Sequence, residues 1–266
     1  MDWNKIKTIF ILAFLILDIY LIYEYTRLKE SSEQFEYKQG PSVEKILSSY
    51  GITYPKELPK NSKDQYLSAK SKTFSKEELT KWEKGLLKGQ EVTIVDSNIL
   101  QSILEKPISI GEPFKETDLT SYIENHILNG NQYYFWEKKD KTITYYQQYN
   151  GKTLYQNLNG KLIFYLNEEN KVVSYEQTFL ENIKEIEEQE NISRPLDAIY
   201  TLFTNSYIDN DSKIKKVELG YYSQQYSTTQ VLSPTWYILL DNGQNLFVNA
   251  LDNQIIKTKS EQIKLE

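Results

Sequence analysis

Few side chains in this sequence could carry out acid–base or metal chemistry. The chain has no cysteine and one histidine, His126, which excludes a zinc site built from His and Cys ligands. A Ser-His-Asp triad would depend on that single imidazole. His126 shares one face of a predicted helix with Leu119 and Ile123, as a packed histidine would. We interpret His126 as structural and keep a hydrolase as an alternative.

The usual motifs of catalysis and ligand binding are also missing. The sequence contains no Gly-rich phosphate loop, no G-x-S-x-G elbow and no H-E-x-x-H pair. Asp241 and Asp252 lack the spacing of a calcium-binding loop. We therefore predict no catalytic residue, no cofactor and no metal.

Three residues near the N-terminus point instead to interaction. Asp18 is the only acid in the apolar stretch Ile6–Tyr23. An acid inside hydrocarbon costs about 2.5–3.5 kcal/mol on insertion scales unless it is paired. Either water reaches Asp18 near the outer interface, or Asp18 bonds to a polar group on a neighbouring membrane helix. Tyr20 and Tyr23 have rings that suit the membrane interface, and we predict all three as interaction residues.

The element that must position these side chains is a helix at residues 6–25, which we predict to span a membrane. About 20 apolar residues cross a bilayer core of about 30 Å, and this stretch is mostly Ile, Leu, Phe and Tyr. A cleaved signal peptide would need small residues at the cut, whereas Tyr23–Arg27 is bulky and charged. We predict a cytoplasmic tail at residues 1–5, a linker at 26–40 and an extracellular remainder, anchored in the cell membrane by this single span.

The composition limits what the remainder can bind. The net charge of −6 argues against nucleic acid as a partner. The absence of cysteine excludes disulfides and a Cys-linked lipid anchor. The residues beyond the predicted linker are enough for one large or two small lobes.

The predicted fold class is α+β, with antiparallel sheet meanders and packed helices. From residue 133 to 178 the pattern has period two, and Asn150-Gly151 and Asn159-Gly160 interrupt it. Asn-Gly is the strongest two-residue hairpin signal because both residues tolerate positive φ. The predicted strands of this Tyr-rich meander are 133–137, 142–149, 153–157, 162–166 and 172–178.

Helical spacing and capping signals predict the helices. Ser75 and Glu78 have the spacing of a capping box, and Pro195 suits a first helical turn. The predicted helices are 41–49, 75–85, 117–130, 179–190 and 195–207. Further strands are predicted at 66–74, 91–95, 214–223, 235–240 and 245–250, with 99–104 either a strand or a short helix and a break at 107–113.

A helix followed by a meander occurs twice, at residues 117–178 and 196–256. We predict an N-terminal α+β lobe at residues 41–181 and a C-terminal α+β lobe at 182–266, and a shared topology of the two is one option. The aromatic residues could fill these cores or build a protein-contact surface. They are Trp82, Trp136, Trp236 and the Tyr pairs at 133–134, 145–146 and 221–222.

Three segments of the sequence resemble one protein family. They are the opening MDWNKIKTIFILAFLILDIYL, the middle YNGKTLYQNLNGKLIFYLNEENKVVSYEQTFL and the closing PTWYILLDNGQNLFVNALDNQI. These segments are similar to the YycI (WalI) family, and the resemblance extends over essentially the whole chain. The closing segment also resembles a PepSY-type strand pair.

This resemblance implies a single-pass membrane protein of Gram-positive bacteria. It implies as partners the sensor kinase WalK (YycG), of a two-component system that governs cell-wall turnover, and a YycH-like protein. The family offers no catalytic residue. We therefore expect a non-enzymatic regulator of the kinase that acts through its membrane helix, in contact with membrane lipid, and through its ectodomain. The alternative is an extracytoplasmic module that binds a wall glycan or a peptide.

Overall fold

The structure, a computed structural model, describes residues 3–33, 42–83, 85–186, 188–223 and 227–257. The chain divides into two compact units, Met1–Ser42 and Val43–Glu266. The helices are α1 (Trp3–Glu33), α2 (Val43–Ser49), α3 (Lys76–Glu83), α4 (Thr117–His126) and α5 (Pro195–Thr204), with the short 3-10 helix η1 (Gly130–Gln132).

The first unit contributes one described element, the helix α1. The side chains of its apolar stretch from Phe10 to Tyr23 are all exposed within the chain. No helix in the described part of the chain combines the length and hydropathy that a membrane span needs. The span at residues 6–25 stays a prediction.

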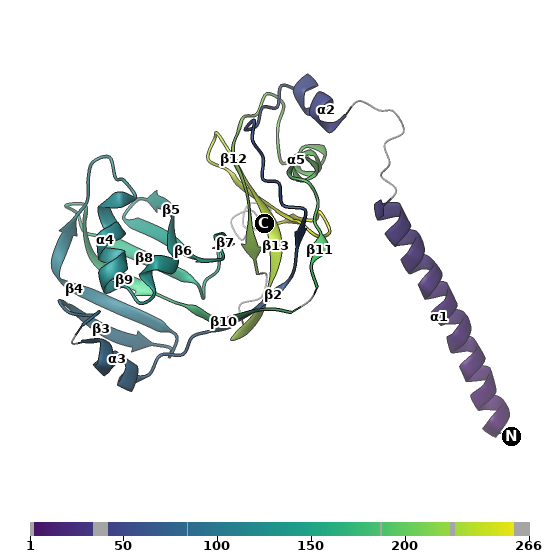
Figure 1. Cartoon of the computed structure of the whole chain (residues 1–266), viewed down its shortest axis with the longest axis horizontal. Coiled ribbons are helices and arrows are strands. Elements are labelled where there is room, and N and C mark those ends of the chain that lie inside the picture. The colour runs from purple at the N-terminus through teal and green to yellow at the C-terminus, as the bar shows by residue number, and fades with distance from the viewer. Residues whose placement is uncertain (1–2, 34–41, 84, 187, 224–226, 258–266) are drawn as a thin grey trace. The chain divides into compact units, whose positions relative to one another are not determined.

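The second unit is an α+β structure dominated by an antiparallel sheet, which confirms the predicted fold class for this part of the chain (Figure 1). A path of hydrogen-bonded strands runs β10-β2-β13-β12-β7-β6-β8-β9-β4-β3. β14 extends the sheet from β13, β15 pairs with β14, and β5 pairs with β6. A separate pair joins β1 (Lys63–Asp64) to β11 (Glu190–Asn191).

The sheet has two halves, each with its own apolar core. The strands of the first half are β3 (Gln90–Val95), β4 (Ile99–Ser109), β5 (Tyr133–Lys139), β6 (Thr142–Tyr149), β8 (Lys161–Leu166) and β9 (Lys171–Gln177). The strands of the second half are β2 (Leu67–Ser71), β12 (Ile214–Tyr222), β13 (Thr229–Leu240), β14 (Asn245–Asn249) and β15 (Ile255–Ile256). Two further strands complete the path. β7 (Lys152–Tyr155) lies between β12 and β6, and β10 (Leu180–Glu185) lies at the end of the path beside β2.

Helix α4 covers the first half. Leu119 and Ile123, one turn apart, are buried against Phe164 and Tyr175 of the sheet. Helix α3 begins with the predicted capping box, because the Glu78 backbone N–H donates to Ser75 Oγ at 3.2 Å and the Ser75 N–H donates to Glu78 Oε2 at 3.1 Å. Leu79 and Trp82 of α3 pack against the same core, so both helices lie on this half.

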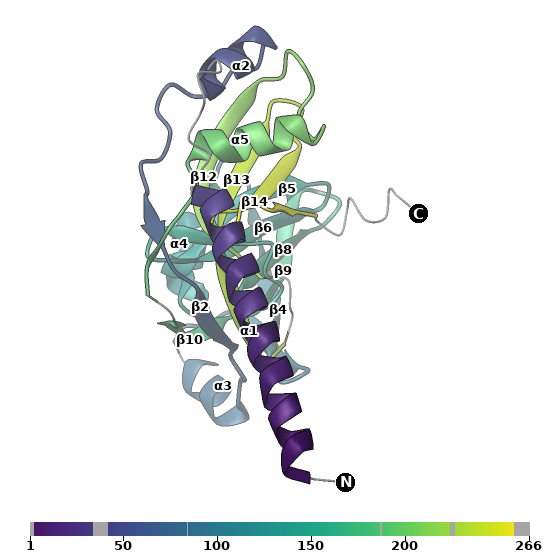
Figure 2. The ribbon, with the colours of Figure 1, turned by 90° about the vertical axis from the view of Figure 1, so that its right-hand side faces the viewer.

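Helix α5 lies across β12 and β13 in the second half (Figure 2). Ala198, Ile199 and Leu202 are fully buried on its inner face. Val43 and Leu47 of α2 join this same core, and β2 pairs with the first residues of β13. Residues of α2 and β2 thus pack with the C-terminal strands, and the division into lobes at 41–181 and 182–266 stays a prediction.

Two predicted elements were wrong in type or partner. Residues 179–190, predicted as a helix, contain strand β10, which pairs antiparallel with β2. The 153–157 segment is the strand β7 (Lys152–Tyr155), which pairs antiparallel with the end of β6, as the meander predicts. The predicted pairing of β7 with β8 is wrong: β8 pairs with β6, and the other edge of β7 runs parallel to β12. Pairing across the chain overrode the local helical spacing.

Some element boundaries also differ. Helix α4 ends at His126 rather than at 130, because the chain turns extended at Ile127. The segment 99–104 is a strand, β4, and it continues through the predicted break at Pro107 to Ser109. The register with β9 shifts between Ile103 and Ile108. Pro107 lies within this irregular part of the ladder, where a sheet can accommodate proline because proline has no N–H to donate.

Candidate functional site

The first candidate interaction surface lies on α1. Thr8, Leu12, Ala13 and Ile16 line a shallow groove of about 280 Å³ on this helix. Residues three and four positions apart are neighbours on one face of a helix, which is how these side chains come together. The groove is almost entirely apolar, and Ala13 supplies the small side chain that opens it.

The predicted interaction residues divide between two sides of α1. Tyr20 follows the groove residue Ala13 by about two helical turns, and Tyr23 follows the groove residue Ile16 by the same distance. Both tyrosines therefore lie on the groove side. Asp18 follows Ile16 by two positions, which at about 100° per residue turns it to the other side. The structure therefore brings Tyr20 and Tyr23 to one face, and Asp18 does not share it.

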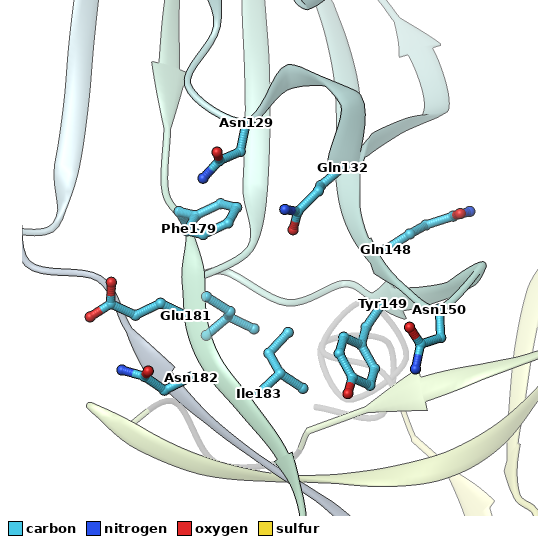
Figure 3. Close-up of a pocket in the computed structure, with 10 residues that line it drawn as sticks. Asn129, Gln132, Gln148, Tyr149, Asn150, Phe179, Glu181, Asn182 and Ile183 are labelled. Carbon is cyan, nitrogen blue, oxygen red and sulfur yellow. The ribbon is translucent and has the colours of Figure 1, made fainter. Parts of the chain in front are cut away.

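The second candidate surface is a groove in the second unit, with a volume of about 480 Å³. Its walls come from the loop before η1, the end of β6 and the strand β10. The lining residues are Asn129, Gln132, Gln148, Tyr149, Asn150, Phe179, Leu180, Glu181, Asn182 and Ile183. Figure 3 shows the Tyr149 and Ile183 side chains projecting into the space between β10 and the end of β6, whereas Gln148 points away from it.

The buried side chain of Gln147 connects two walls of this groove. Its side chain is fully buried, and its carboxamide makes a bond in each direction to Leu180 on β10. The Leu180 N–H donates to Gln147 Oε1 at 2.8 Å, and Gln147 Nε2 donates to the Leu180 carbonyl at 2.9 Å. The same Nε2 lies 3.2 Å from Gln132 Oε1. Gln147 therefore fixes β10 beside the end of β6.

Most of the aromatic residues that could have formed a contact surface fill cores instead. Trp236 is fully buried beneath α5, and its indole N–H donates to the Ser193 carbonyl at 3.0 Å. Trp136 of β5 lies 5.0 Å from the Tyr237 ring, in an aromatic cluster with Tyr155 and Phe247. Of the Tyr pairs, Tyr134 is the member with an exposed ring. These Tyr pairs therefore do not form an exposed aromatic contact surface.

His126 is packed, as interpreted from the sequence. Its ring stacks on Tyr122 with centroids 4.8 Å apart, and its backbone carbonyl accepts from Gln90 Nε2 at 3.2 Å. The Tyr122 hydroxyl donates to Gln90 Oε1, and burial raises the pKa of Tyr122. Among the described residues, no group of three or more His, Cys, Asp or Glu side chains is placed to hold a metal ion.

Sequence reasoning missed the groove beside β10. Its residues are mainly carboxamide, aromatic and aliphatic side chains from three separate segments, and no spacing in the sequence connects them. The one local signal was the series of Asn residues at turn positions. Asn129, Asn150 and Asn182 all adopt left-handed backbone with φ near 50°, which Asn tolerates better than most residues.

The described residues thus present a groove on the apolar helix α1 and another on the α+β second unit. The family model described as YycI protein matches residues 28–251, so the chain belongs to the YycI family. Membership indicates a regulator of the WalK (YycG) system rather than an enzyme.

Two further comparisons accompany this match. The C-terminal domain of Bacillus megaterium YpeB is similar with a TM-score of 0.41 and 11% sequence identity, over 81% of this chain and 94% of that chain. A search of curated proteins finds no match.

Proposed function

We propose that this chain is a non-enzymatic, membrane-anchored regulator of the sensor kinase WalK (YycG), acting together with a YycH-like partner. Residues 1–5 are cytoplasmic, the apolar stretch of α1 lies in the cell membrane, and the second unit is extracellular. The α1 helix packs beside the membrane helices of the kinase and favours one of its two signalling states. A bias of this kind needs differential contacts of about 1–3 kcal/mol.

The observation that carries this proposal is the exposed apolar surface of α1. Large side chains such as Phe10, Ile11 and Ile22 are more than half exposed within the chain. Soluble proteins rarely expose a contiguous apolar surface of this kind without a function for it. Lipid and partner helices are the environment that suits it, and family membership identifies the signalling system.

The groove side of α1 is the face that we assign to the kinase. It carries the small side chain of Ala13 between Leu12 and Ile16, and small residues let helix backbones approach closely in a membrane. Tyr20 and Tyr23 extend the same face toward the outer interface. We assign Asp18, on the other side of α1, to a contact with a second helix, such as that of the YycH-like protein.

Co-purification of the tagged full-length chain with the kinase from membranes tests this assignment. Ala13→Phe fills the groove and should reduce the recovered kinase at least about fivefold, since losing about 1 kcal/mol of packing has that effect. Phe14→Leu, an apolar exchange roughly opposite the groove, is the matched control and should leave recovery unchanged.

Asp18→Leu separates the two faces in the same experiment. We expect it to reduce recovery of the YycH-like protein and to leave kinase recovery close to that of the unaltered chain. Kinase recovery that survives Ala13→Phe and Asp18→Leu alike would refute the role given to the membrane helix.

A further inference from the structure

The strand β10 has one edge without a strand partner. It pairs with β2 on one side and ends the path of paired strands in the described part of the chain. Such an edge presents N–H and C=O groups to which another extended chain can bind. The groove of about 480 Å³ lies along this edge.

Gln147 already binds this edge in the way that a peptide would. A carboxamide carries the same donor and acceptor as a backbone peptide group. At Leu180 it accepts one hydrogen bond at 2.8 Å and donates another at 2.9 Å, as a residue of a neighbouring antiparallel strand does. The next edge positions, Asn182 and Ile183, line the groove itself.

A β-bulge shapes these next positions. The register of β10 on β2 shifts between Glu181 and Lys184, and Asn182 has a φ of 53°. Bulges bend the strand and redirect side chains. Here the bulge lies where Ile183 projects beside Tyr149, and both side chains pack against the apolar cluster that contains Leu180.

The remaining groove wall is polar but almost uncharged. Asn129, Gln132 and Asn150 contribute carboxamides, which can pair with both the N–H and the C=O of a peptide. Glu181 is the charged residue of the lining, and its carboxylate lies 3.6 Å from the Lys72 ammonium. This surface offers no net charge to attract a strongly charged ligand.

We propose that the groove beside β10 binds an extended polypeptide segment with uncharged side chains. The segment adds to the free edge of β10 beyond Leu180 and places an apolar side chain against Tyr149 and Ile183. Strand addition of this kind takes affinity from main-chain hydrogen bonds and specificity from alternate side chains. The proposal goes beyond the regulatory function above, and it does not depend on which surface the kinase contacts.

The test uses the full-length protein in detergent micelles. The probe is a library of synthetic peptides of about six residues, a typical strand length, capped at both ends and built from Val, Leu, Thr, Ser, Asn and Gln. We expect a subset to bind and to slow amide hydrogen exchange at Asn182 and Ile183. Ile183→Lys should weaken that binding at least about tenfold, as loss of a central apolar contact does.

Ile186→Lys is the matched control on the same segment, since Ile186 is exposed and outside the groove lining, and it should bind as the unaltered chain does. Asn182→Gly keeps the left-handed backbone without strain and removes a lining carboxamide, so it should weaken binding even if Ile183→Lys fails to fold. Equal affinity for all three variants, or no peptide bound at millimolar concentration, would overturn the proposal. So would a soluble N-acetylglucosamine tetramer that protects the same amides while the peptides do not.

Discussion

At the scale of single residues, a buried carboxylate joins three strands that are far apart in the sequence. Asp64 of β1 accepts a hydrogen bond from Lys152 Nζ of β7 at 2.6 Å and from the Tyr221 hydroxyl of β12 at 2.7 Å. The Lys152 ammonium also lies 5.3 Å from the centre of the Tyr221 ring. Burial, together with the Asp64 carboxylate, raises the pKa of Tyr221. This cluster ties β7 to the second half of the sheet.

Removing the charge of Asp64 should therefore be costly. We expect Asp64→Asn to lower the free energy of unfolding by about 3 kcal/mol, because a partly buried ammonium loses its partner. Urea unfolding of the full-length chain measures this change in the free energy of unfolding. Glu218→Gln breaks the exposed pair with Lys216 at 2.9 Å and should cost less than about 1 kcal/mol. Equal losses in the two variants would show that the Asp64 cluster does not hold the strands together.

At the scale of elements, the parallel pairing of β7 with β12 depends on one glycine. Tyr221 pairs with Leu154 and Tyr222 with Tyr155 in this short ladder. Just before it, a Cβ on Gly220 would lie 2.3 Å from Tyr155 Cε2 and 2.4 Å from the Thr153 carbonyl oxygen. No side chain fits there, so the close approach of the two strands requires glycine.

Gly220→Ala should lower the free energy of unfolding by about 1–3 kcal/mol or more, since overpacked sites cost that much. Thermal unfolding followed by tryptophan fluorescence reports it, because Trp236 is fully buried on the neighbouring strand. A Cβ on Gly85 would meet nothing within 4 Å, so Gly85→Ala should change stability by no more than about 0.5 kcal/mol. The prediction fails if the two substitutions shift the midpoint equally.

At the scale of the whole molecule, the apolar cores of the second unit contain many tyrosines, such as Tyr133 and Tyr175 in the first half and Tyr155 and Tyr237 in the aromatic cluster. Burial raises the pKa of Tyr122, Tyr133 and Tyr175 above the ordinary value near 10. Burial and the hydrogen bond to Glu176 raise the pKa of Tyr165 to about 12. The folded state thus resists the ionisation of these phenols.

This distribution predicts sensitivity to alkali. Because the folded pKa values are raised, the tyrosine contribution to stability is fully present below about pH 10 and is lost as the pH rises through the folded values. The urea midpoint should fall above about pH 10, together with a rise in phenolate absorbance. Tyr175→Phe should make the fall shallower, whereas Tyr134→Phe, whose ring is 49% exposed, should leave it unchanged. A midpoint independent of pH in this range would contradict the prediction.

The sequence by itself determined the features that depend on neighbouring residues. The capping box of Ser75 and Glu78, the amphipathic face of α5 and the hairpins of the Tyr-rich strands all arise within a few positions along the chain. The composition of the apolar stretch in α1 and the absence of catalytic motifs likewise need no partner to be recognised. Family membership follows from the same residues.

Only the tertiary structure decided the features that depend on distant partners. Residues 180–185 have helical spacing but form β10, because β2 offers a ladder of backbone hydrogen bonds. β7 pairs with β6 on one edge and with β12, rather than β8, on the other, because Gly220 allows the close approach of β12. The groove combines Gln132, Tyr149 and Ile183 from separate segments. Long-range pairing is worth more to each of these segments than its own local preference, and no window of the sequence contains both partners.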